Sequence, residues 1–310
     1  MADELFTLAA ATSGAPASAP FGRVLTAMVT PFDDHGALDL DGAAALAEKL
    51  VDDGCDGLVV SGTTGESPTT NDAEKDALLR TVLDAVGARA TVVAGAGSFD
   101  TAHTAEAARA AEKAGAHGLL VVTPYYSKPP QEGLVRHFTT VADATDLPVM
   151  LYDIPARTAT PIATETLLAL AEHPRIVAVK DAKGDLFASS EVMARTDLAY
   201  YSGDDALNLA LLTHGAVGVV SVVAHVAARE YAEMVRAIDS ADLARALRLH
   251  RRLIPAVRAI MTRTQGAIMA KAAVQQAGTI ASRSMRSPLV PATDEQVAQL
   301  RADLAEAGLA

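Results

Sequence analysis

The chain has no tryptophan, one cysteine and an aromatic content of only 4%. A single cysteine excludes an intrachain disulfide, and scarce cysteine is typical of the reducing cytoplasm, where we expect this protein. The longest apolar runs have the length of strands, far below the roughly 18 residues that a membrane helix needs. With 38 acidic against 26 basic side chains the formal net charge is −12, so we expect neither nucleic acid nor a membrane as a partner.

The first twenty residues also lack the basic segment that begins a secretory signal. They are rich in alanine, serine and proline and hold few large apolar side chains. Such a segment cannot bury enough apolar surface to order itself. We therefore predict that residues 1–20 form a disordered N-terminal extension.

From about residue 23 to residue 237, short β-rich runs alternate with alanine- and leucine-rich helical stretches. The expected strands cover residues 24–29, 57–60, 91–94, 118–122, 149–152, 176–180, 199–202 and 218–221. Strict alternation indicates parallel strands with helices outside. Eight such units favour an α/β fold of the (β/α)8 TIM barrel type, over residues 21–237, against an open doubly wound sheet.

After residue 237 the alternation stops. Helical sequence continues to about residue 278, and a last helix is expected over 294–307. Because no polar linker precedes these stretches, we interpret residues 238–310 as a C-terminal helical region packed on the barrel.

One strand ends in a lysine. Residues 176–184 read Ile-Val-Ala-Val-Lys-Asp-Ala-Lys-Gly, which places Lys180 at the end of a run that fits a buried strand. Lysine is rarely buried, and active sites of parallel barrels lie at the carboxyl ends of their strands. A partly desolvated lysine there becomes an amine nucleophile. The alternative is a lysine that snorkels out of the strand end, and this stretch alone supports both readings equally.

Other candidates follow neighbouring strands. Residues 61–67 read Ser-Gly-Thr-Thr-Gly-Glu-Ser, a loop whose amides and hydroxyls suit a carboxylate or phosphate. Tyr152 ends the strand before that of Lys180, so phenol and amine are expected to face one reaction volume. Arg157 offers a forked donor for a carboxylate, or is an ordinary surface arginine. The eight histidines show no metal-ligand spacing, so we predict no metal site.

Together these motifs resemble the dihydrodipicolinate synthase and N-acetylneuraminate lyase superfamily of class I aldolases. The resemblance covers about residues 22–300 and rests on Gly-Thr-Thr-Gly-Glu at 62–66, Tyr152 and Lys180 in that order. Thr-Pro-Tyr-Tyr at 123–126 and Tyr152-x-x-Pro155-x-Arg157 resemble the synthase branch. Ser-Gly-Asp-Asp at 202–205 and Gly-Val-Val-Ser-Val at 218–222 resemble its later motifs.

The resemblance implies a lyase that condenses pyruvate with L-aspartate 4-semialdehyde to 4-hydroxy-tetrahydrodipicolinate, in lysine and diaminopimelate biosynthesis. Lys180 would form a Schiff base with pyruvate, which serves as the electron sink, so no external cofactor is implied. Tyr152 would shuttle protons, and Thr64 would link it to Tyr126 of a neighbouring subunit. The family further implies a homo-oligomer that is a dimer of dimers. Its substrate-binding residues correspond to Thr63 and Thr64 for the pyruvate carboxylate, Arg157 for that of the semialdehyde, and Gly203 and Val220 along the pocket.

The family's feedback site for lysine uses histidine, asparagine and glutamate side chains. By alignment, this chain has Asp72, Lys75, Phe99 and His103 in that region. Lys75 would repel a cationic effector and Phe99 removes an amide, so we expect weak or absent inhibition by lysine. Asp153 stands where asparagine is common, a change that we interpret as harmless.

Two alternatives stay open. A sibling pyruvate-dependent aldolase acting on a sugar acid shares the fold and the lysine, but Arg157 suits a short aldehyde that carries a carboxylate. A non-catalytic ligand-binding barrel would be expected to lack Lys180, Tyr152 or Thr64, and the chain has all three.

Overall fold

The computed structural model describes residues 18–309. Most of the predicted N-terminal extension, residues 1–17, lies outside this described part. The chain enters the fold at Pro20 and Phe21, and the Phe21 side chain is fully buried.

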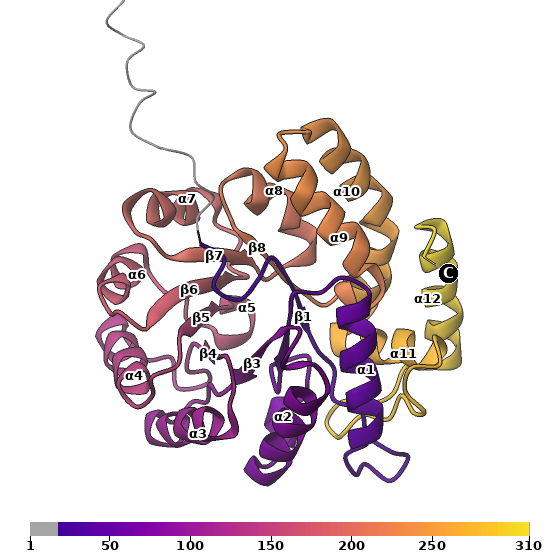
Figure 1. Ribbon diagram of the computed structural model, residues 1–310, viewed down its shortest axis with the longest axis horizontal. Helices are drawn as coiled ribbons and strands as arrows, with labels where there is room; N and C mark the ends of the chain where they lie inside the picture. Colours follow the sequence, from indigo (N-terminus) through magenta and orange to yellow (C-terminus); the bar gives the residue numbers. More distant parts are fainter. Residues whose placement is uncertain (1–17, 310) are drawn as a thin grey trace, which may run out of the picture.

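Eight parallel strands close into a barrel in sequence order, with β8 returning to β1 (Figure 1). The strands are β1 (Val24–Ala27), β2 (Gly57–Val60), β3 (Thr91–Gly95), β4 (Gly118–Val122), β5 (Val149–Asp153), β6 (Ile176–Asp181), β7 (Ala199–Ser202) and β8 (Gly218–Ser221). The predicted TIM barrel and its strands are confirmed. The largest difference is at β1, which ends two residues before the expected end.

The strands are short and almost wholly buried, as their composition requires. All four residues of β2 and all four of β8 are buried. Such strands pack against side chains of the barrel interior on one face and against helices on the other, so their sequences are continuous apolar runs without alternation.

Helices follow the strands and surround the barrel (Figure 1). They are α1 (Leu40–Asp52), α2 (Asp72–Val86), α3 (Thr101–Ala114), α4 (Gln131–Asp143), α5 (Pro155–Thr158), α6 (Thr164–Ala171), α7 (Leu186–Arg195), α8 (Asn208–Thr213) and α9 (Ala224–Asp239), with short 3-10 turns at Ser67–Thr69 and Asp205–Leu207. At the start of α2, Asn71 and Glu74 form a capping box.

Three further helices and one π turn lie on one side of the barrel (Figure 1). They are α10 (Leu243–Val257), the π turn Arg258–Thr262, α11 (Gly266–Gln276) and α12 (Asp294–Glu306). Nine successive residues of α11 are buried, so this helix lies inside the molecule rather than on its surface. The assigned boundary at residue 237 falls two residues before the end of α9 and remains an interpretation.

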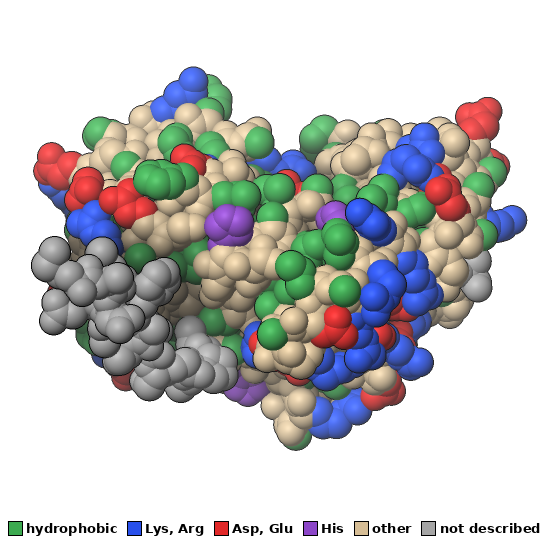
Figure 2. Space-filling model, turned by 90° about the horizontal axis from the view of Figure 1, so that it is seen from above, with side chains coloured by type: hydrophobic (Ala, Val, Ile, Leu, Met, Phe, Trp, Pro, Cys, Tyr) green, Lys and Arg blue, Asp and Glu red, His purple; other side chains and the backbone are tan. Residues whose placement is uncertain are grey.

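Lys and Arg side chains gather over the side formed by α10 (Figure 2). Two of the arginines on this helix lie beside carboxylates of α9: Arg245 is 2.8 Å from Glu233 and Arg252 is 3.5 Å from Glu230. These pairs reduce the positive potential of the helix. None of the described helices is long and apolar enough to cross a membrane.

Candidate active site

Lys180 and Tyr152 lie side by side at the carboxyl ends of β6 and β5. The two residues are register partners in the parallel pair of strands. The Lys180 Nζ lies 4.2 Å from the centroid of the Tyr152 ring. Only 4% of Lys180 and 5% of Tyr152 is exposed. The predicted proximity of amine and phenol is confirmed, and their catalytic roles remain predictions.

Burial changes the acid–base chemistry of the lysine. It lowers the pKa of Lys180 to about 8, because desolvation penalises the ammonium form. The carboxylate of Asp205 opposes this change, whereas the guanidinium of Arg157 adds to it. A lysine with this pKa holds far more neutral amine near neutral pH than an exposed one, as a carbonyl nucleophile requires.

The phenol is held in its protonated form. Burial raises the pKa of Tyr152 to about 12, while Arg157 and a hydrogen bond with the Thr63 side chain oppose the rise. A protonated phenol beside the amine can donate a proton and take it back, as a relay requires.

Thr63 is the loop threonine whose side chain lies beside the Tyr152 phenol. The expected link through Thr64 involves Tyr126 of a neighbouring subunit and stays a prediction. Thr64 is buried and makes no side-chain hydrogen bond within the described residues.

Gly203 leaves room for the lysine itself. A Cβ atom built on Gly203 would lie 2.8 Å from Cγ and 2.9 Å from Cε of Lys180. We expected this glycine to line the ligand pocket. In the structure the first group that needs its small size is the Lys180 side chain, which passes directly over it.

The other predicted residues are placed as follows. Arg157 is exposed on the single turn α5, yet close enough to affect both Lys180 and Tyr152 electrostatically. Val220 is fully buried in β8. Tyr126 is 94% exposed, with a left-handed backbone at φ +73°, so one chain alone does not bring it to the phenol.

A small pocket adjoins the phenol. Besides Tyr152, it is lined by residues of the β2 loop, of β3 and β4, and of the loops after them: Ser61, Gly62, Thr63, Ser67, Pro68, Gly95, Gly97, Leu120, Val122 and Tyr125. Its loop amides and hydroxyls lie at the carboxyl ends of the strands, where a small anionic substrate would meet them.

The four residues expected at the feedback site line a second cavity. Nε2 of His103 lies 3.5 Å from a carboxylate oxygen of Asp72. Phe99 is 61% exposed and packs edge-on against Tyr125, with ring centroids 5.5 Å apart. Lys75 places a positive charge in the same cavity.

The sequence did not indicate that Asp205 lies near Lys180 or that Lys183 pairs with a buried carboxylate. Asp205 is buried and accepts hydrogen bonds from the backbone amides of Val222 and Val223 at 2.9 and 3.0 Å. Lys183 forms an ion pair with the buried Asp153. Asp205 belongs to a motif that was noted, but its burial depends on contacts with a distant strand. Within the described chain, no group of three or more metal-binding side chains converges.

Comparison with known proteins agrees with this geometry. The Dihydrodipicolinate synthetase family matches residues 20–307. A 4-hydroxy-tetrahydrodipicolinate synthase of Kineococcus radiotolerans is 69% identical over 291 residues, or 94% of each chain.

Two solved structures have nearly the same fold. A synthase of this family from Cyanidioschyzon merolae with lysine bound has a TM-score of 0.91 and 42% identity, over 94% of this chain and 99% of that one. A dihydrodipicolinate synthase from Acinetobacter baumannii complexed with pyruvate has a TM-score of 0.89 and 32% identity, over 94% of this chain and 100% of that one. The chain therefore belongs to the dihydrodipicolinate synthetase family.

Proposed function

We propose that this chain condenses pyruvate with L-aspartate 4-semialdehyde to 4-hydroxy-tetrahydrodipicolinate, the step that serves lysine and diaminopimelate biosynthesis. One observation carries the proposal: a buried lysine amine lies against a buried phenol at the carboxyl ends of adjacent barrel strands. Membership of the synthase family favours this reaction over the sugar-acid aldolase and the non-catalytic barrel.

The first step joins pyruvate to Lys180. The neutral amine attacks the ketone carbon, the ketone oxygen leaves as water, and a Schiff base remains. Tyr152 relays one proton from the nitrogen and a second from solvent to the departing oxygen, so that water leaves and the imine stays protonated, with Thr63 beside the phenol. Loop amides and hydroxyls at Thr63 and Thr64 hold the pyruvate carboxylate.

The second step forms the new carbon–carbon bond. Loss of a methyl proton converts the Schiff base into an enamine, whose carbon attacks the semialdehyde carbonyl carbon. The aldehyde oxygen takes a proton and becomes the hydroxyl of the product. The amino group of the semialdehyde then attacks the imine carbon and releases the lysine amine, so one water leaves overall. The protonated imine is the electron sink, and the reaction needs no external cofactor.

Arg157 provides the selectivity for the second substrate. Its guanidinium lies near both Lys180 and Tyr152 and presents paired donors to a carboxylate. The semialdehyde carries such a group within a short chain. Gly203 and Val220 complete the pocket around the lysine.

Borohydride trapping tests the assignment. Reduction in the presence of pyruvate is expected to add a stable pyruvate-derived group to Lys180, located by peptide mass mapping, together with turnover of aspartate semialdehyde. Lys180→Arg, which keeps the charge, is expected to abolish both signals. An adduct without semialdehyde turnover would support the sugar-acid aldolase, and no adduct would exclude Schiff-base chemistry.

We also propose a homo-oligomer, a dimer of dimers, in the cytoplasm. The exposed Tyr126 completes the proton relay of a neighbouring copy in this arrangement. Sedimentation at assay concentrations is expected to show an assembly larger than the monomer. Tyr126→Phe is expected to lower kcat without changing the sedimentation. A fully active monomer would contradict the shared relay.

A further inference from the structure

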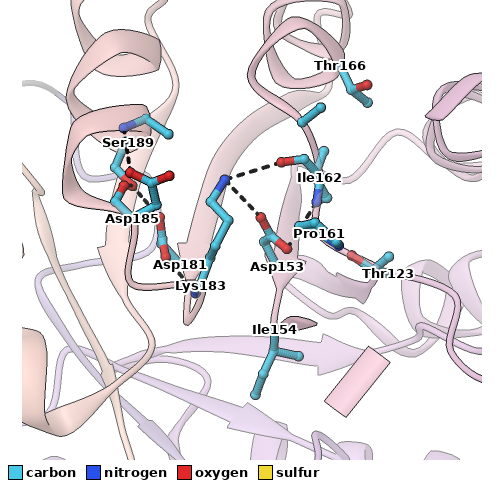
Figure 3. A network of polar contacts seen from close by, with 12 residues as sticks. Thr123, Asp153, Ile154, Pro161, Ile162, Thr166, Asp181, Lys183, Asp185 and Ser189 are labelled. Carbon is cyan, nitrogen blue, oxygen red and sulfur yellow. Dashed lines mark hydrogen bonds and ion pairs between the residues drawn. The ribbon is translucent and has the colours of Figure 1, made fainter. Parts of the chain in front are cut away.

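The connection from β5 to α6, residues 154–163, carries Arg157 on an exposed turn. Its far end is held at Ile162 by two buried or nearly buried charged side chains, one from β5 and one from the loop after β6 (Figure 3). These are Asp153, directly after Tyr152, and Lys183, three residues after Lys180. Neither side chain enters the mechanism described above.

Both polar groups of the Ile162 backbone are bound by this pair. The Ile162 amide donates to Oδ1 of Asp153 at 3.2 Å, and the Lys183 Nζ donates to the Ile162 carbonyl at 3.2 Å. The Lys183 Nζ also lies 3.3 Å from Oδ2 of Asp153 (Figure 3). Three contacts among three residues therefore close a clamp on one residue of the connection.

The two charged side chains of the clamp depend on each other. Asp153 is fully buried and the Lys183 side chain is 14% exposed. Oδ2 of Asp153 makes no hydrogen bond with the described residues, so its partner is the Lys183 ammonium at ion-pair distance. A buried carboxylate that loses its counter-charge is strongly destabilised.

Lys183 is itself fixed to the strand that carries Lys180. Oδ1 of Asp181 accepts hydrogen bonds from the backbone amides of Lys183, at 2.8 Å, and of Gly184, at 3.2 Å. Asp181 also accepts from the Ser189 hydroxyl on α7. The loop after β6 is thus rigid, and the clamp joins the ends of the two strands that hold Tyr152 and Lys180.

The near end of the connection is held as well. The Thr158 hydroxyl donates to the carbonyls of Ile154 and Thr160, each at 3.1 Å. With Ile162 fixed, the turn that carries Arg157 has anchors on both sides. An exposed guanidinium on a four-residue turn depends on such anchors for its position.

We propose that the Asp153–Lys183 pair positions Arg157 and so sets the affinity of the enzyme for the carboxylate of its second substrate, which neither side chain touches. This inference rests on the proposed function, because it takes Arg157 as the group that binds the semialdehyde. The carboxylate of pyruvate is assigned to the loop after β2, outside this connection, so the pair is expected to change the KM for the semialdehyde far more than the KM for pyruvate.

The test measures the two substrates separately. Lys183→Met is expected to raise the KM for aspartate semialdehyde about tenfold, as expected for the loss of a charge-assisted hydrogen bond. The KM for pyruvate and the rate of adduct formation on Lys180 are expected to stay within about twofold of the unsubstituted protein. Lys113→Met, an exposed lysine at the end of α3, is the matched control and is expected to change neither.

A second variant separates positioning from folding. Asp153→Asn with Lys183→Met removes both charges and keeps the acceptor for the Ile162 amide, so it is expected to fold and to recover most of the semialdehyde affinity. Asp153→Ala with Lys183→Met lacks both contacts to Ile162, and its KM for the semialdehyde is expected to rise again. Equal semialdehyde affinity in these two double variants would overturn the proposal.

A double-mutant cycle of Lys183→Met with Arg157→Ala shows whether the Asp153–Lys183 pair acts through Arg157. In an Arg157→Ala background, Lys183→Met is expected to add nothing to the KM for the semialdehyde. A full additive loss, or parallel changes in both substrates, would overturn the positioning role. Failure of the proposed function is distinct, because the unsubstituted protein would then not turn over the semialdehyde at all.

Discussion

Lys180 shows how one strand end converts an ordinary side chain into a reactive one. Its amine is surrounded by Tyr152 and the apolar wall of the barrel, and desolvation outweighs the attraction of Asp205. The result is a pKa of about 8. Lysine is rarely buried, and here burial in the core is what makes the Lys180 amine reactive.

The rate of pyruvate adduct formation is expected to follow the titration of this amine. Below about pH 8 the ammonium form dominates, so the rate is expected to fall about tenfold for each further pH unit, and above about pH 8 it is expected to level off. Initial rates of borohydride-trapped adduct, measured from pH 6 to 10, check this. A midpoint close to 10.5, the ordinary value for lysine, would contradict the desolvated environment.

Gly203 makes a second prediction at this scale. In Gly203→Ala the new methyl group would meet Cγ and Cε of Lys180 at under 3 Å, so the lysine must move. A displacement of this kind is expected to lower kcat about a hundredfold, while the melting temperature changes little. Gly133→Ala on α4 is the control, because its methyl group would find its nearest neighbour at 3.4 Å. Unchanged kcat in Gly203→Ala would show that the lysine has room to spare.

Among the elements, α11 contributes more than its distance in sequence suggests. Its Lys271 is fully buried and forms an ion pair with Glu66, in the same loop as Thr63. The Lys271 ammonium also donates to the Ser284 carbonyl at 2.9 Å, and the Arg286 amide donates to Glu66 at 2.9 Å. The C-terminal region thus holds the loop after β2 in place through one carboxylate.

Lys271→Met is expected to lower the free energy of unfolding by about 3–5 kcal/mol, because it leaves the carboxylate of Glu66 buried without its counter-charge. Denaturant titration of the assembled protein measures the change. Adding Glu66→Gln to this variant removes the charge and is expected to restore part of the stability. The exposed Lys113→Met serves as the control and is expected to stay within about 0.5 kcal/mol. Loss of stability in the control as well would assign the effect to lysine removal in general.

For the whole molecule, the fold is shared with the structure from Cyanidioschyzon merolae that holds lysine. The cavity expected to take an effector is lined here by the cationic Lys75 and by the ring of Phe99, where the family resemblance implies an amide. A bound lysine would bring a second cation beside Lys75, and two cations in one cavity repel each other.

Synthase activity is therefore expected to fall only modestly at millimolar lysine. Steady-state assays over a lysine titration measure this, with pyruvate and semialdehyde near their KM values. Lys75→Gln is expected to increase the sensitivity, since it removes the repelling charge. Strong inhibition of the unsubstituted protein by micromolar lysine would contradict the prediction.

The sequence alone determined the barrel and the meeting of a lysine with a tyrosine at the ends of its strands. Apolar runs of four to six residues, alternating with helices, predict the strands because burial on both faces leaves a local signature. Lys180 and Tyr152 could be brought together from sequence, since successive strands of a parallel barrel are neighbours and their carboxyl ends meet.

Only the tertiary structure decided which groups act on that lysine and tyrosine. Thr63 lies beside the phenol, Gly203 makes room for the lysine, and Lys183 pairs with Asp153. The link between Glu66 and Lys271 joins residues 205 positions apart. Such contacts leave no periodic trace in the chain, because they depend on side-chain direction and on packing between distant segments.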